Sequence, residues 1–89
     1  MKIINPATEE IITDVQEDSI ESVTRKFEAL RLAQPSWQNV QIASRVAIVK
    51  KFSDLLEKNI EHLASTLTSE VGKPLQQSRN EINGARARI

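Results

Sequence analysis

The strongest constraint on the fold is an apolar row that runs through residues 40–72. Hydrophobic side chains recur there at steps of three and four, namely Ile42, Val46, Val49, Phe52, Leu56, Ile60, Leu63, Leu67 and Val71. Such spacing places them on one face of an α-helix roughly 45 Å long, at 1.5 Å per residue. Ile48, Leu55 and Ala64 widen the row, and charged side chains occupy the other face. The remaining residues are too few to cover this helix easily, so we expect it to need a further surface.

The first residues predict a small β-hairpin. The turn Asn5-Pro6-Ala7-Thr8-Glu9 separates two short apolar runs. Asn-Pro starts turns, because proline fixes φ and an asparagine side chain bonds the nearby backbone. Residues 1–17 are therefore predicted to form a hairpin followed by a linker. Two strands alone are marginal in water, so we expect the hairpin to dock on another part of the protein.

The first of three predicted helices covers residues 18–34. Asp18 or Ser19 is the expected N-cap, and Glu21 has the spacing to close a capping box on Asp18. Pro35 disfavours helical backbone in the residue before it and is expected to end the helix.

The other two predicted helices are a long one over residues 39–72 and a third over residues 74–89. Asn39 is the expected N-cap of the long helix, and Gly72 supplies the left-handed residue that ends it. The third helix has no terminator before Ile89, so we expect a truncated element. The segment is thus mostly α-helical, with a short hairpin in front.

Composition excludes several kinds of site. The chain has no cysteine and one histidine, which rules out disulfides, thiolate nucleophiles and zinc sites built on cysteines or several histidines. Lysines and arginines number 12, as do acids, but the bases concentrate after residue 24. The basic end lacks interleaved aromatic residues, so we expect no nucleic-acid partner. No signal peptide or transmembrane span is apparent, and we expect no membrane partner and a cytoplasmic location.

Taken together, these motifs resemble the start of an aldehyde dehydrogenase. The resemblance covers essentially all 89 residues and rests on the order and spacing of short motifs: Asn5-Pro6-Ala7-Thr8-Glu9-Glu10, the helix over residues 18–33, Trp37 followed by Arg45, the Phe52, Leu55, Leu56 and Glu57 set, Glu70-Val71-Gly72-Lys73-Pro74, and Glu81 followed by Gly84-Ala85. One position departs, because the family usually has glycine where this chain has Glu9. If that position needs a positive φ, Glu9 costs about 1 kcal/mol or the turn takes another shape.

The resemblance implies an α/β parent enzyme, with this segment as the N-terminal part of its Rossmann-like cofactor domain. It implies NAD(P)-dependent oxidation of an aldehyde to a carboxylic acid, semialdehydes being the preferred subgroup, by a homo-oligomer. In the family the cysteine nucleophile, the oxyanion stabilisers, the glutamate base and the dinucleotide site all lie further along the chain. We therefore expect no catalytic and no cofactor-binding residue within residues 1–89, and an inactive segment when it stands alone.

The resemblance also suggests one metal site. In some aldehyde dehydrogenases the acid that matches Glu70 helps to hold a structural monovalent cation, together with main-chain oxygens that here belong to Ile3 or Ile4. From the residues alone, Glu70 is a solvated acid in the last turn of a helix, where it mildly opposes the helix dipole.

For four other side chains we expect a structural or solvated role rather than a functional one. Lys73 is expected to neutralise helix-end carbonyls rather than bind phosphate, and His62 to be a solvated surface residue. Arg45 is expected to bond a neighbouring loop or acid, and Trp37 to plug the junction of the first two helices. The charged run of residues 57–61 is expected to be a wet helix face.

A second hypothesis is a stand-alone helical module whose long apolar row binds a partner protein. Periodicity cannot separate the two hypotheses, because both predict amphipathic helices. The order of the motifs favours the dehydrogenase segment. An open reading frame continuing past Ile89 to a catalytic cysteine would decide for it, and a stop codon there would favour the module.

Overall fold

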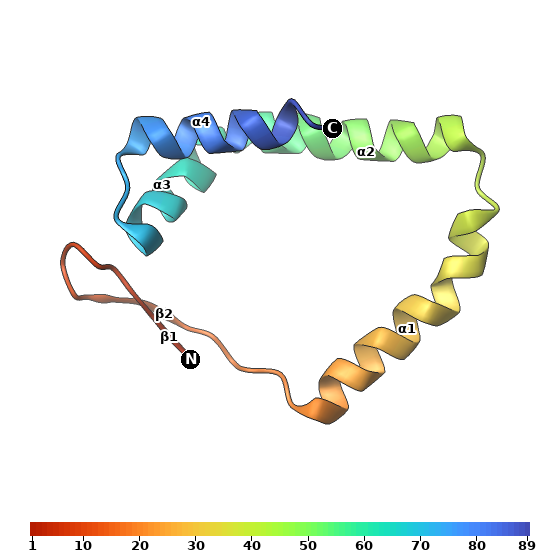
Figure 1. The fold of residues 1–89 in the computed structure, drawn as a ribbon, viewed down its shortest axis with the longest axis horizontal. Helices are drawn as coiled ribbons and strands as arrows, with labels where there is room; N and C mark the ends of the chain where they lie inside the picture. The colour runs from red at the N-terminus through yellow and green to blue at the C-terminus, as the bar shows by residue number, and fades with distance from the viewer.

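A computed structural model describes residues 1–89 as a two-stranded sheet followed by four helices that surround an open centre (Figure 1). The radius of gyration is 17.2 Å and the extents are 48 × 35 × 16 Å. A compact domain of this length would have a radius of gyration of about 12 Å. The chain therefore forms an open frame.

The hairpin forms where the turn residues predict it. Strand β1 (Lys2–Ile4) pairs antiparallel with β2 (Ile11–Asp14), with an irregular register after Ile3. The Asn5 side chain accepts a bond from the Ala7 amide at 2.9 Å, which confirms its predicted turn-forming role. Glu9 has a φ of 62°, so the position where the family prefers glycine does require the left-handed conformation.

Helix α1 (Ile20–Gln38) starts two residues later than the predicted range of 18–34, and its cap is one of the two expected residues. Ser19 is its N-cap, and the Ser19 hydroxyl accepts the Ser22 amide at 3.2 Å. The predicted capping box of Glu21 on Asp18 is therefore wrong, because the third helical residue is Ser22 and Glu21 is the second. Both acids still lie in or beside the first turn, where negative charge favours the helix dipole.

Helix α1 also continues through Pro35, where the sequence predicts its end at residue 34. Proline lacks the N–H that would bond the Arg31 carbonyl, so the helix loses one backbone hydrogen bond at Pro35 but does not end there. The Ser36 hydroxyl donates to the Ala33 carbonyl at 2.9 Å, and the Asn39 amide reaches the Pro35 carbonyl at 3.3 Å. These bonds complete the last turn, and Asn39 becomes its C-cap.

The predicted long helix is two helices, α2 (Ile42–Lys58) and α3 (Ile60–Val71). Its predicted N-cap, Asn39, is wrong, since Gln41 holds that position. The break lies at Asn59, whose side-chain amide donates to the Leu55 carbonyl at 2.8 Å. Asparagine competes in this way with the regular backbone ladder, which an apolar periodicity does not reveal.

Helix α4 (Leu75–Arg86) packs against α3 and lies antiparallel beside α2 (Figure 1). It ends three residues before Ile89, so the prediction of a helix running to the last residue is wrong. Ala64 on α3 and Ser78 on α4 are both fully buried, and their small side chains allow the helices to approach. The hydroxyls of Thr68 and Ser78 share a hydrogen bond at 2.8 Å across this contact.

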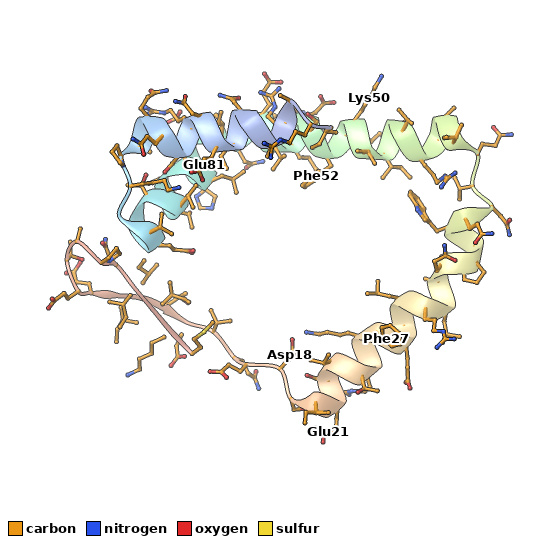
Figure 2. The ribbon with its side chains drawn as sticks, viewed as in Figure 1. Asp18, Glu21, Phe27, Lys50, Phe52 and Glu81 are labelled. Carbon is orange, nitrogen blue, oxygen red and sulfur yellow. The ribbon has the colours of Figure 1, made fainter.

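The long apolar row stays largely uncovered. Ala64 and Ser78 are the only two buried residues of the chain, while Phe52 is 54% exposed. Figure 2 shows Phe52 on the side of α2 that faces the open centre and Lys50 on the other side. The expectation that residues 1–89 cannot cover the row by themselves is confirmed.

Candidate functional site

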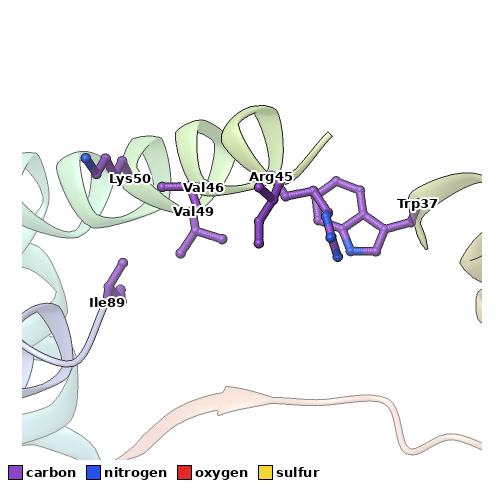
Figure 3. Close-up of a pocket in the computed structure, with 7 residues that line it drawn as sticks. Trp37, Arg45, Val46, Val49, Lys50 and Ile89 are labelled. Carbon is purple, nitrogen blue, oxygen red and sulfur yellow. The ribbon is translucent and has the colours of Figure 1, made fainter. Parts of the chain in front are cut away.

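An apolar groove lies at the start of α2. Its volume is about 330 Å³, and its lining consists of Trp37, Ile42, Arg45, Val46, Val49, Lys50 and Ile89. Trp37 comes from the last turn of α1 and Ile89 from the residues after α4, so three parts of the chain contribute (Figure 3). We call this the Trp37 groove.

Two sequence-predicted residues meet in the Trp37 groove. Figure 3 shows the Arg45 side chain beside the Trp37 indole, both projecting from the α1–α2 junction. Trp37 is 42% exposed, so it lies at the predicted junction without closing it. The predicted bond from Arg45 to a loop or acid is absent, and its buried Nε has no hydrogen-bond partner.

A second set of polar residues ties α4 to α2 and α3. Arg79 donates two bonds of 2.8 Å to the Glu61 carboxylate on α3, and Arg86 pairs with Glu57 on α2 at 2.8 Å. The two acids flank Asn59, so α4 contacts both sides of the break between the helices. The run Glu57, Lys58 and Glu61 is exposed, as expected, but its two acids also pair with α4, which the sequence interpretation missed. The missed signal is the seven-residue spacing of Arg79 and Arg86, which places them on one face of a helix.

The pKa shifts in this set favour charged, structural roles. The hydrogen bonds from Arg79 lower the pKa of Glu61, and the Glu61 carboxylate raises the pKa of Arg79. At the start of α1, the Lys26 ammonium bond lowers the pKa of Asp18, aided by the Ser22 hydroxyl. Lowered carboxyl pKa values oppose use as a general acid near neutral pH.

The other candidate residues lie in or just after α3 and in the hairpin. Lys73 forms an ion pair with Glu81 rather than with helix-end carbonyls, which still makes it structural. His62 is exposed, as expected. Glu70 lies two residues before Gly72 and Ile4 two residues before Pro6. A Cβ at Gly72 would lie 2.9 Å from the Pro6 ring, so the two segments come together.

No group of three or more histidines, cysteines, aspartates or glutamates is placed to hold a metal ion. The chain has no cysteine, and its two glycines, Gly72 and Gly84, lie in separate elements rather than in one phosphate-binding loop. None of the helices is both long and apolar enough to span a membrane.

Comparison with known proteins gives the context of this frame. The aldehyde dehydrogenase family model matches residues 1–89. The methylmalonate-semialdehyde dehydrogenase (acylating) of Arabidopsis thaliana mitochondria is 36% identical over 80 residues, which cover 90% of this chain and 13% of that protein. The glutarate-semialdehyde dehydrogenase of Pseudomonas putida is 34% identical over 82 residues, covering 92% of this chain and 17% of that protein.

A 3,6-anhydro-alpha-L-galactose dehydrogenase of Vibrio is 32% identical over 84 residues, covering 94% of this chain and 18% of that protein. No solved structure matches the chain. These relatives are several times longer than the chain, which spans 13% to 18% of their length. The match over all of residues 1–89 and the identities above 30% show that the chain belongs to the aldehyde dehydrogenase family, as its N-terminal segment.

Proposed function

We propose that residues 1–89 are the N-terminal structural part of an oxidoreductase that oxidises an aldehyde to a carboxylic acid with NAD or NADP. In this role the segment belongs to a Rossmann-like cofactor domain, in a homo-oligomeric enzyme of the cytoplasm. Catalytic and cofactor-binding groups come from elsewhere in the polypeptide. The segment itself provides packing surface for the rest of the enzyme and no catalytic group.

The observation that carries this proposal is the open frame itself. The family model matches the whole chain, yet only two of the 89 residues are buried. A folded domain of this size normally buries a continuous apolar core, because burial offsets the conformational entropy lost on folding. A frame with its apolar row open on the inner side has the form of a part that folds against a larger body.

Semialdehydes are the substrate class we favour. Two of the three relatives named above carry a semialdehyde in their names, and the third acts on an anhydro-sugar by its name. The residues that contact the aldehyde lie outside this segment, so the preference comes from the relatives.

A chimera tests the proposal. Residues 1–89 replace the matching segment of the Pseudomonas putida glutarate-semialdehyde dehydrogenase, and reduced cofactor is followed with glutarate semialdehyde as substrate. We expect the chimera to turn over and the relative without its segment to be inactive. The 89-residue chain alone should reduce neither NAD nor NADP with any aldehyde. A soluble, folded but inactive chimera, or saturable turnover by the chain alone, would contradict the proposal.

We also propose that the Glu70 carboxylate and the Ile4 carbonyl contribute two oxygens to a structural monovalent cation site. The Pro6–Gly72 contact supports this, because it brings their two segments together. None of the chain's hydrogen bonds or ion pairs engages the Glu70 carboxylate, which leaves both oxygens open to a cation. Melting of the chimera in potassium, sodium and choline chloride tests the site. Stabilisation by one alkali cation should disappear in Glu70→Gln and persist in Glu28→Gln.

A further inference from the structure

We propose that the Trp37 groove seats an apolar segment bearing a carboxylate, which pairs with Arg45. The segment belongs to the dehydrogenase polypeptide outside residues 1–89. This inference rests on the proposed function and adds to it the contact by which the frame recognises the rest of the enzyme.

The apolar side chains of the groove favour an apolar occupant. Ile42 is 72% exposed, and Val46 and Val49 lie on the same face of α2 with nearly half of their surface open. They adjoin the Trp37 ring in a hollow of about 330 Å³. Contiguous exposed apolar surface of this kind marks an interaction site.

The charged part of the groove specifies what the occupant carries. The Arg45 Nε is shielded from solvent and makes no hydrogen bond, and such an unpaired donor is costly. Lys50 adds a second cation to the lining, which contains no acidic side chain. A carboxylate suits this arrangement, because it accepts two parallel bonds from a guanidinium.

The remaining dehydrogenase polypeptide is the occupant that best fits the rest of the structure. The relatives are longer than this chain by factors of five or more, given the 13% to 18% of their length that it spans. Val49 in the groove lies three residues before Phe52, on the same face of α2. Phe52 is on the side of α2 that turns toward the open centre of the frame (Figure 2). One body filling that centre would cover the row and the groove together. The alternative occupant of the groove, which the experiment below distinguishes, is a second copy of the chain.

The single tryptophan of the chain makes the groove directly observable. The chain is prepared with 5-fluorotryptophan, so that one fluorine NMR signal reports on residue 37. It is titrated with the Pseudomonas putida relative that lacks its own matching segment. The segment removed from the relative serves as the positive control. Its binding shows that the shortened relative is able to bind such a segment.

The matched variants are Arg45→Met, which removes the charge and keeps an apolar stem, and Lys51→Met, an exposed lysine on α2 outside the groove. We expect the body to shift the signal saturably, with affinity weakened at least tenfold in Arg45→Met and less than twofold in Lys51→Met. The chimera gives the same contrast within one chain, where Arg45→Met should lower the melting temperature more than Lys51→Met does.

Three results would overturn the inference. A signal that moves with the concentration of the chain alone would make a second copy the occupant. Binding seen by sedimentation, but with equal affinities for the two variants or no fluorine shift, would place the contact on another face and leave the proposed function intact. If the relative's own segment binds the shortened relative but this chain does not, both this inference and the proposed function are contradicted.

Discussion

The ring of Pro6 lies against Gly72, the residue that ends α3. Gly72 has a φ of +72°, and a Cβ built on it would stand 2.9 Å from the Pro6 Cγ. The hairpin turn therefore touches the backbone of the helix end, while Ile4 and Ile11 on the strands stay about half exposed. The expected docking of the hairpin on another part of the protein is seen only at this one contact. Glycine meets two demands here, the left-handed conformation and the close approach.

Gly72→Ala should therefore destabilise the chain. The left-handed backbone alone costs about 1–2 kcal/mol for a residue with a Cβ, and the Pro6 ring must also move. Gly84→Ala is the matched control, because nothing lies within 4 Å of its Cβ and it sits inside α4. Alanine there should stabilise the helix by roughly 0.5–1 kcal/mol. Urea unfolding followed by circular dichroism measures both, and shifts of the same sign would contradict the Pro6–Gly72 contact.

Glu9→Gly should stabilise the hairpin. Glu9 is the one residue other than glycine with a positive φ, at 62°. Glycine removes a strain of about 1–2 kcal/mol and adds about 0.4–1 kcal/mol of unfolded-state entropy, so a modest gain remains. Glu10→Gly is the control, since that residue has ordinary φ and its carboxylate accepts the Thr8 hydroxyl. The control should lose stability in the same unfolding assay, and a loss in Glu9→Gly as well would contradict the strain.

Local rules predicted the parts of the fold that local chemistry controls. The hairpin turn, the left-handed Gly72 and the apolar row follow from residue types and spacing, and the structure has all three. The rules failed at Pro35 and Asn59, where a single side chain shifts a helix boundary. A proline in the last turn removes one backbone hydrogen bond without ending the helix, and an asparagine amide that bonds its own helix leaves no trace in the hydrophobic period.

The Trp37 groove and the ion pairs of α4 depend on tertiary packing. The sequence alone marks Arg45 and Trp37 as residues of interest, but their contact with Ile89 requires α4 to fold back along α2. The partners of Glu57 and Glu61 lie more than fifteen residues away in the chain. The spacing of Arg79 and Arg86 places both on one face of a helix, but it does not say which acids they meet. That depends on the break at Asn59 and the return of α4.

Acid should weaken the contact between α3 and α4 through Glu61. Its folded-state pKa is lowered by Arg79, so this stabilisation is complete above the ordinary pKa of a glutamate, about 4.3, and is lost as pH falls through the lowered value. Glu61→Gln should therefore flatten the decline of stability below about pH 4.3. Melting curves across that range provide the measurement. Glu28→Gln, an exposed acid on α1, is the control, and equal flattening by both variants would contradict the role of Arg79.

Leu56→Asp should be among the most damaging single changes in α2. Leu56 is half-buried in the middle of the apolar row, where most of its neighbours are exposed. The change removes roughly 1–2 kcal/mol of burial and adds the cost of placing an unpaired carboxylate beside apolar side chains. Such a loss lowers the melting temperature of a chain this size by about 5 °C or more. Asp54→Ala is the matched control, because Asp54 is an exposed residue of α2 without an ion pair. We expect a shift of less than about 2 °C for Asp54→Ala, and equal shifts for both variants would show that the row at Leu56 faces water.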